Sequence, residues 1–177
     1  ANLECCWTII RPTYIWGPYH PRNSKDLFYS IKKRWYLFPG KLPIIRSYGY
    51  VKNVAKQIVK ILEVQDDLVD RKVFYVGDKP LNYYEWVNLF SLKLTGKAVR
   101  IVPRKLLYYI ALVGEGIGRL TSKPFLMNMY RYKNMTFNNL TPMDKTFEVL
   151  GHLDDNLENN VEETTKWLNM EFKSSVK

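Results

Sequence analysis

Residues 5–18, CCWTIIRPTYIWGP, contain the clearest structural signal in the chain. The first six residues are apolar on both sides and rich in β-branched types, which predicts a short buried strand over residues 5–10. Arg11 and Pro12 should end that strand, and the glycine and prolines that follow predict a loop. This loop carries Tyr14, Ile15 and Trp16. Loops so rich in large apolar residues usually line a surface or a site.

Short apolar segments alternate with amphipathic segments along the rest of the chain. Further strands are predicted at VFYVG (73–77) and VRIVP (99–103). Helices are predicted over residues 25–35, 51–62, 82–95, 103 to about 120, from about 124, over 142–150, and from 156 onward. This alternation indicates an α/β architecture. Few strands are present, and none is followed by the glycine-rich turn that opens a doubly wound sheet, so the chain looks like the second half of a larger fold.

Helical periodicity predicts which residues face the core. One face of the first helix comprises Leu27, Phe28, Ile31 and Trp35. One face of the second comprises Val51, Val54, Ile58 and Leu62, with its lysines outward. Asn23 or Ser24 should cap the first helix. Asn82 should cap the third, and Gly96 should end it.

Composition indicates a folded domain. The 177 residues are 46% apolar and 15% aromatic, which is enough for a packed core and excludes a disordered tail. No apolar run approaches the ~20 residues that span a bilayer, and the first residues lack the features of a signal peptide. Cys5 and Cys6 are adjacent on the predicted strand and cannot form a long-range disulfide. These observations predict a soluble protein of the reducing cytoplasm.

The charge is concentrated in the first third of the chain. The formal net charge is +10, and residues 1–61 hold eleven Lys and Arg against Glu4 and Asp26. Such a surface could attract nucleic acid, anionic lipid or a phosphorylated small molecule, or could simply be solvated. No zinc-finger spacing or helix-turn-helix pattern accompanies the charge, so we expect no nucleic-acid partner.

No self-contained catalytic or metal site is evident. Residues 114–118, GEGIG, have neither the spacing nor the context of a dinucleotide-binding loop and predict close helix packing or a helix end. His20 and His152 are far apart, so we expect no metal site. Three Tyr-x-x-x-Lys pairs occur, Tyr29/Lys33, Tyr48/Lys52 and Tyr75/Lys79, and they are only weak evidence for a catalytic pair because a chain so rich in Tyr and Lys contains such matches by chance. We assign no catalytic residue.

Three segments in matched order carry a specific resemblance. TIIRPTYIWGP (8–18), RSYGYVKNVAKQIVKIL (46–62) and FYVGD (74–78) resemble the C-terminal half of the extended short-chain dehydrogenase/reductases, the NAD-dependent epimerase/dehydratase family. The resemblance covers residues 1–177 and implies a partial Rossmann-like α/β fold with few short strands and many helices. It also implies that these residues form the substrate-binding portion, whereas the dinucleotide-binding portion with the catalytic Tyr and Lys is absent. We expect the isolated piece to be inactive.

The resemblance also suggests roles for individual residues. Pro12 and Thr13 would abut the nicotinamide of NAD or NADP, while Tyr14, Trp16 and Arg46 would contact a nucleotide-diphosphate sugar. A guanidinium fork suits a diphosphate better than an ammonium group does. For Trp16 the alternative is core packing, and for Arg46 it is an ordinary surface or ion-paired arginine. The whole protein would be an NAD(P)-dependent epimerase, dehydratase or reductase.

Some positions depart from the nucleotide-sugar pattern. Tyr14 stands where many such enzymes have Asn, and Asn53 stands where many have Asp. Residues 50–55, together with the apolar VPRKLLYYIALVGE (102–115), are similar to the 3β-hydroxysteroid dehydrogenase-like branch. An apolar hydroxyl substrate or a non-catalytic scaffold therefore remain alternatives. The apolar helix could cap a lipid-like substrate, contact a membrane surface, form a homodimer interface or pack in the core.

Overall fold

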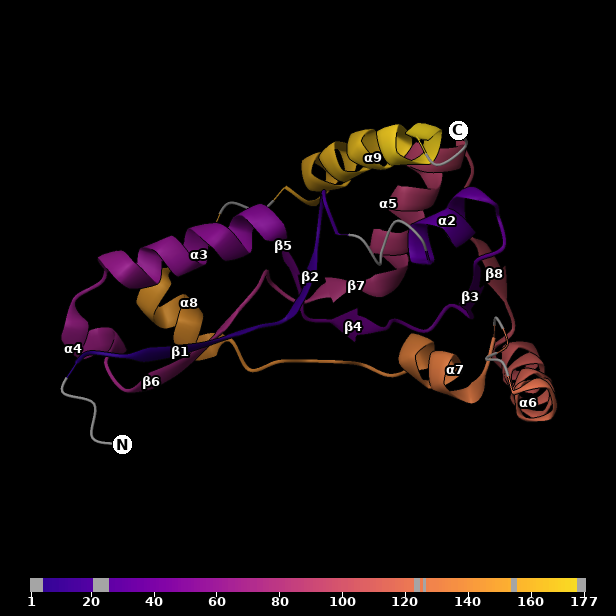
Figure 1. Cartoon of the computed structure of the whole chain (residues 1–177), viewed down its shortest axis with the longest axis horizontal. Coiled ribbons are helices and arrows are strands. Elements are labelled where there is room, and N and C mark those ends of the chain that lie inside the picture. The colour runs from indigo at the N-terminus through magenta and orange to yellow at the C-terminus, as the bar shows by residue number, and fades with distance from the viewer. Residues whose placement is uncertain (1–4, 21–25, 123–124, 126, 154–155, 175–177) are drawn as a thin grey trace.

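The computed structural model describes residues 5–20, 26–122, 125, 127–153 and 156–174. Within these residues the chain is a mixed α/β structure with eight helices and four two-stranded ribbons. Figure 1 shows the ribbons following one another along an elongated molecule, with helices on either side of them. The predicted fold class, with few short strands and many helices, is confirmed.

The first ribbon forms one end of the molecule. β1 (Thr8–Pro12) runs parallel to β6 (Lys72–Val76), with Ile10 opposite Phe74. α3 (Val51–Glu63) and α8 (Asp144–Leu150) both contact β6, and the short α4 (Asp66–Val69) precedes it. The apolar core at this end consists of Val54, Ile61, Val69, Phe74, Val76 and Leu150.

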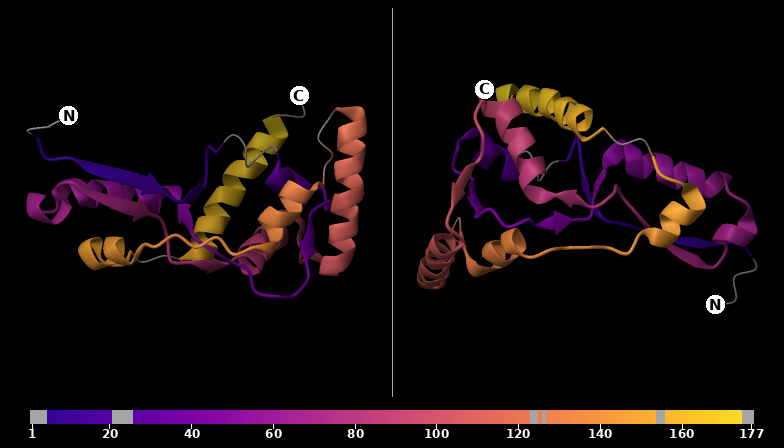
Figure 2. Two further views of the ribbon diagram at one scale, coloured as in Figure 1. Left: turned by 90° about the horizontal axis from the view of Figure 1, so that it is seen from below. Right: turned by 180° about the vertical axis from the view of Figure 1, so that it is seen from behind.

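Three smaller ribbons continue from this end, as Figure 2 shows from two further sides. Two of them are parallel and pair β2 (Tyr14–Trp16) with β5 (Tyr48–Tyr50), and β3 (Leu37–Pro39) with β8 (Arg100–Val102). The third is antiparallel and pairs β4 (Ile45–Arg46) with β7 (Leu81–Asn82). Each parallel pair joins segments far apart in sequence, because parallel strands need a long crossover connection.

An aromatic core occupies the middle of the molecule. α2 (Leu27–Lys32), α5 (Tyr83–Thr95) and α9 (Leu157–Ser174) enclose it. The Trp16 ring lies against those of Tyr50, Trp86 and Phe90, with centroid distances of 5.1, 5.6 and 5.7 Å. Edge-to-face and tilted contacts of this kind stabilise a core beyond the area that they bury.

The caps of α5 follow the sequence prediction. The Asn82 side chain accepts a hydrogen bond from the Tyr84 N–H at 3.0 Å, and Gly96 ends the helix with a φ of 69°. An asparagine in the first position and a left-handed glycine in the last satisfy backbone groups that a helix leaves unpaired.

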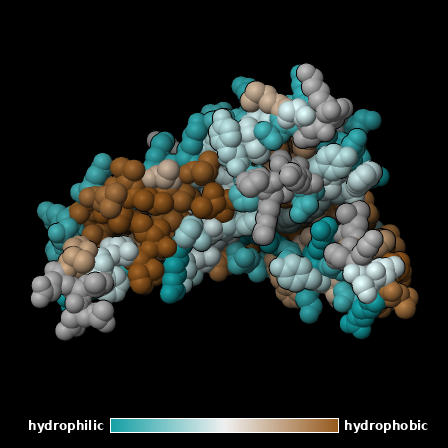
Figure 3. Space-filling model, viewed as in Figure 1, coloured by the Kyte–Doolittle hydropathy of each residue, from teal (hydrophilic) through white to brown (hydrophobic). Residues whose placement is uncertain are grey.

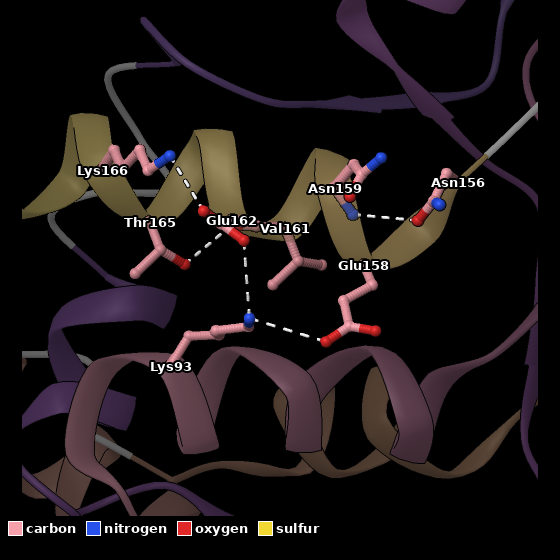
Figure 4. A network of polar contacts seen from close by, with 8 residues as sticks. All are labelled: Lys93, Asn156, Glu158, Asn159, Val161, Glu162, Thr165 and Lys166. Carbon is pink, nitrogen blue, oxygen red and sulfur yellow. Dashed lines mark hydrogen bonds and ion pairs between the residues drawn. The ribbon is translucent and has the colours of Figure 1, made fainter.

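Ion pairs tie α5 to the C-terminal helix α9. Figure 4 shows Lys93 of α5 between two carboxylates of α9, with its Nζ 3.5 Å from Glu158 Oε1 and 3.6 Å from Glu162 Oε2. Val161 and Leu168, on the same side of α9, are fully buried. Burial of these apolar side chains supplies most of the stability of the contact, because exposed ion pairs contribute little.

Two helices lie at the far edge of the molecule. α6 (Arg104–Thr121) packs against α7 (Met129–Thr136), and both lie well away from β1 (Figure 1). Gly114 is buried at this contact, where an added Cβ would collide with the Met127 carbonyl oxygen and lie 2.7 Å from Phe125 Cδ1. The predicted close helix packing at the GEGIG segment is therefore confirmed at Gly114. None of the helices in the described part of the chain is long and apolar enough to cross a membrane.

The structure corrects the predicted start of the chain. The first strand is residues 8–12, not 5–10, and Cys5 and Cys6 precede it as exposed free thiols. Residues 14–16, predicted to be a loop, form β2 because they pair in register with residues 48–50. Pro12 is accommodated because it is the last residue of β1, at an edge where a missing N–H costs least.

The predicted helices also need correction. α2 covers residues 27–32 only, and the proposed caps at 23 and 24 lie outside the described residues. Trp35 is 56% exposed and does not join the buried face. Leu62 is likewise exposed, because the buried face of α3 carries Asn53 and Gln57 instead. α7 begins at Met129, whereas position 124 lies outside the described residues, and α8 begins at Asp144 instead of 142.

The α6–α7 contact gives a matched test of packing. Gly114→Ala should lower the free energy of unfolding by about 1–3 kcal/mol, because the new methyl group meets backbone that must move. Gly116→Ala is the control, since nothing lies within 4 Å of its added Cβ, and it should raise stability by up to about 1 kcal/mol through helix propensity. Denaturant unfolding of both variants checks this, and equal effects would contradict the packing described.

Candidate functional site

Arg46 and three tyrosines form one cluster near the centre of the molecule. β2 places Tyr14 beside Tyr48 of β5, with ring centroids 4.8 Å apart. The Tyr48 ring lies 6.1 Å from that of Tyr83, the first residue of α5. β4 holds the Arg46 guanidinium 4.6 Å from the centroid of the Tyr83 ring. Four elements therefore bring together Tyr14 and Arg46, two of the residues predicted from the sequence.

Arg46 is a buried cation for which the described residues supply no carboxylate partner. Its residue is 8% exposed, and none of the ion pairs found in the described part of the chain involves it. Nη2 donates a long hydrogen bond of 3.4 Å to the Phe137 carbonyl, while the buried Nε has no hydrogen-bond partner among the described residues. The alternative of an ordinary surface or ion-paired arginine does not fit this environment.

The backbone around Arg46 is held on two sides. Antiparallel pairing places Arg46 opposite Leu81 of β7. On the other side, the Ser47 N–H donates to the Asn139 carbonyl at 2.8 Å, and the Asn139 N–H donates to the Ile45 carbonyl at 3.1 Å. The position of the guanidinium is therefore fixed by both flanking segments.

Burial disfavours ionisation of two tyrosines of the cluster, Tyr48 and Tyr83. Burial raises the pKa of Tyr48 well above its ordinary value, although the nearby Arg46 opposes the rise. Burial likewise raises the pKa of Tyr36 and of Tyr83, whose hydroxyl oxygens lie 2.9 Å apart. A tyrosine that acts as a base needs the opposite shift. The phenols of Tyr48 and Tyr83 can therefore donate hydrogen bonds and provide ring surface.

The other residues predicted for the site occupy different environments. Trp16 is 1% exposed in the aromatic core, so the packing alternative describes it and we drop the ligand-contact role. Pro12 is exposed at the end of β1. The Thr13 N–H donates to the Val76 carbonyl at 2.9 Å, and its buried hydroxyl faces Gly49 and Gly77, where added Cβ atoms would collide with it. The Thr13 hydroxyl has no hydrogen-bond partner among the described residues.

A buried polar network next to this cluster was missed by sequence reasoning. The Asp78 carboxylate accepts from the Tyr50 N–H at 2.5 Å and from Asn53 Nδ2 at 2.8 Å. Gln57 both accepts from the Gly77 N–H and donates to the Gly77 carbonyl, each at 2.8 Å. A carboxylate at the start of α3 is favourable because the helix N-terminus is partly positive. The network fixes the turn after β6 against α3.

None of the Tyr-x-x-x-Lys pairs has the geometry of a proton-transfer pair. Tyr48 is buried in β5, while Lys52 forms an ion pair of 2.5 Å with Glu163. The Lys33 ammonium lies 5.6 Å from the Tyr29 ring centroid on the exposed side of α2. Tyr75 belongs to β6 and Lys79 to the turn that follows it.

Comparison with known proteins identifies the fold. No protein-family model matches the sequence, and no curated protein is similar to it. Among solved structures, UDP-glucuronic acid 4-epimerase from Bacillus cereus in complex with NAD is 14% identical with a TM-score of 0.61, covering 97% of this chain and 47% of that one. UDP-glucose 4-epimerase from Thermotoga maritima is 15% identical with a TM-score of 0.59, covering 99% and 48%. The protein gox2253 is 16% identical with a TM-score of 0.61, covering 93% and 49%.

The chain has a partial Rossmann-like fold. It spans about half the length of the structures that it matches. At this level of identity the similarity concerns the fold alone, and several of the structures that share it are nucleotide-sugar epimerases.

The contact between Glu163 and the start of α3 predicts a pH dependence. Glu163 accepts from Lys52 and from the Tyr50 hydroxyl, and these hydrogen bonds hold the pKa of its carboxyl below the ordinary 4.5. A carboxyl whose pKa is lowered by folding stabilises the folded state at pH values above its unfolded-state pKa. This stabilisation is lost as the pH falls through the pKa that the group has in the folded state. Glu163→Gln should therefore lower the unfolding temperature at pH 7, and this loss should shrink as the pH falls below 4.5 and the carboxylate is protonated, as measured by circular dichroism.

Glu148→Gln, on the exposed side of α8, is the control for this measurement. A pH-independent effect of Glu163→Gln, or the same response in the control, would contradict the tether between α9 and α3.

Proposed function

We propose that residues 1–177 form the portion of an NAD(P)-dependent epimerase, dehydratase or reductase that binds a nucleotide-diphosphate sugar. The observation that carries the proposal is the buried Arg46 guanidinium, which lacks a carboxylate partner among the described residues. Removing a cation from water costs several kcal/mol, and hydrogen bonds to the Phe137 carbonyl and the Tyr48 side chain offset only part of that. An anionic ligand would offset the rest.

The chemistry of the surroundings favours a diphosphate over a single carboxylate. Arg46 presents a planar fork of donors, its Nε is free of protein partners in the described chain, and the ring of Tyr83 covers its face. A fork of this kind can bind two phosphate oxygens at once. Tyr14, which is partly exposed, lies against Tyr48 with the two rings tilted at 42° and offers ring surface to the sugar or base. The solved UDP-glucuronic acid 4-epimerase that shares the fold was crystallised with UDP-glucuronic acid and NAD.

The residues predicted for the cofactor fit only in part. Pro12 is exposed at the end of β1 and could contact the nicotinamide of NAD or NADP, which would supply the hydride chemistry. The Thr13 hydroxyl is buried against Gly49 and Gly77, so this side chain is not free to contact the nicotinamide. No residue of the described chain has the arrangement of a proton-transfer pair, and we assign that role to another portion of the protein.

The first ribbon supports the existence of such a portion. In the described chain β1 pairs with β6 alone, and parallel two-stranded ribbons are rarely stable by themselves. Ile9, Val59 and Leu62 are exposed on β1 and α3, and Figure 3 shows a broad apolar surface over this end of the molecule. We infer that further strands extend the sheet at the open edge of β1. The exposed thiols of Cys5 and Cys6 fit a reducing cytoplasm.

Arg46→Ala in the whole protein tests the proposal. The variant should lose affinity for UDP-glucose by about 2–5 kcal/mol, because a buried charge pair with the diphosphate is removed. Isothermal titration calorimetry measures the change, with unfolding temperature recorded for each variant. Arg46→Lys keeps the charge but loses the planar fork of donors. Its affinity for UDP-glucose should fall between those of the parent and of Arg46→Ala.

Arg119→Ala is the matched control, since this arginine is exposed on α6 and pairs only with Glu115. A folded Arg46→Ala protein that binds UDP-glucose as tightly as the parent would refute the diphosphate role. That result would favour the alternatives, an enzyme for an apolar hydroxyl substrate or a scaffold without a reaction.

A further inference from the structure

The outward face of α6 is apolar and uncovered. The side chains on this face recur at intervals of three and four residues, so they form one line along the helix. We call them the α6 stripe: Leu106, Tyr109, Leu112, Val113, Ile117 and Leu120. Val113 is 62% exposed and Leu120 is 89% exposed.

The opposite face of the same helix is also apolar. Leu107, Ala111 and Gly114 are buried against the rest of the molecule. A helix that is apolar on both sides normally has both sides covered. The stripe therefore calls for a partner that packs on it from outside.

Charge indicates what that partner is. Residues 97–143, which include α6 and α7, hold eight Lys and Arg against a single acidic residue, Glu115. Arg104 and Lys105 lie in the first turn of α6 and Arg119 lies in its last, so basic groups flank the stripe at both ends. Residues 144–177 instead hold eight acidic residues against four basic ones. Figure 1 shows α9, from this acidic segment, on the opposite side of the molecule from α6.

Two other occupants fit these observations less well. A second copy that packed stripe against stripe would bring two strongly basic regions together, and like charges across an interface are unfavourable. A further portion of the same protein that extends the sheet at β1 would join at the far end of the molecule from α6, as Figure 1 and the right view of Figure 2 both show.

We propose that the α6 stripe docks on the surface of a membrane that contains anionic lipids. The helix lies parallel to that surface, because it is too polar to cross a bilayer. Its apolar side chains enter the boundary between headgroups and acyl chains, and the flanking Arg and Lys contact the anionic headgroups. Tyr130 on the neighbouring α7 is also exposed, and tyrosine is a residue type that favours the boundary between headgroups and acyl chains. The proposal does not depend on the role of Arg46.

Vesicle binding by the whole protein tests the apolar part of this proposal. The parent protein should sediment with vesicles of phosphatidylcholine and phosphatidylserine in a roughly 2:1 ratio. The double variant Val113→Asp, Leu120→Asp should partition at least about tenfold more weakly, because it places charge in the line of buried contacts. The control is Leu92→Asp, Met170→Asp, which changes two exposed apolar residues on α5 and α9 and should bind like the parent.

The charge part has its own test. Lys105→Glu with Arg119→Glu should weaken binding to the same vesicles by at least about fivefold for each basic group lost. Pure phosphatidylcholine vesicles should bind the parent much less than the mixed vesicles do. Circular dichroism of each variant confirms that the fold is kept.

Three results would overturn the proposal. The first is a parent protein that does not bind the mixed vesicles, as expected if a second copy, an acidic protein or another part of the chain covers the stripe. The second is equal binding by the stripe variant and its control. The third is equal binding to vesicles with and without phosphatidylserine. Since UDP-glucose affinity is measured separately, failure here leaves the proposed function standing.

Discussion

The organisation of this molecule centres on a buried positive charge. Arg46 lies on a two-residue strand, in contact with the Tyr83 ring and the Phe137 carbonyl, and no carboxylate of the described chain neutralises it. Cation–π contact and one long hydrogen bond compensate for only part of the lost hydration. Backbone pairing of β4 with β7 and with residue 139 nevertheless keeps Arg46 at this buried position. The described part of the chain therefore holds a buried cation whose lost hydration it only partly replaces.

Much of the fold could be predicted from local sequence signals. Asn82 and Gly96 mark the ends of α5 because capping depends only on residues within one turn. The strand at VFYVG and the last helix were also predicted from local signals, a short apolar run for the strand and helical periodicity for the helix. β2 was missed because its pairing with residues 48–50 is a long-range contact inside a segment rich in Gly and Pro. The buried face of α3 was misjudged because Asn53 and Gln57 bind the turn after β6, and periodicity counts polar residues as exposed.

The candidate site was predictable to a lesser extent. A resemblance in three ordered segments pointed to Tyr14 and Arg46, and the structure places both in one cluster. Tyr48 and Tyr83 complete that cluster, but their proximity arises from pairing between strands and could not be inferred from spacing. Trp16 lies two residues from Tyr14 and therefore on the same face of β2, but it reaches the aromatic core under α5 whereas Tyr14 is at the exposed end of the strand. The positive charge of the α6 region was missed in the sequence analysis. The net charge of residues 62–177 is close to zero because a basic segment, 97–143, is followed by an acidic one, 144–177.

A crystal structure of the whole protein with uridine diphosphate tests the central claim most directly. The account predicts a phosphate oxygen within hydrogen-bond distance of the Arg46 guanidinium, with the nucleotide close to Tyr14 and Tyr48. A bound nucleotide at another place, with the Arg46 guanidinium still against Tyr48, Tyr83 and the Phe137 carbonyl and without a phosphate, would contradict it.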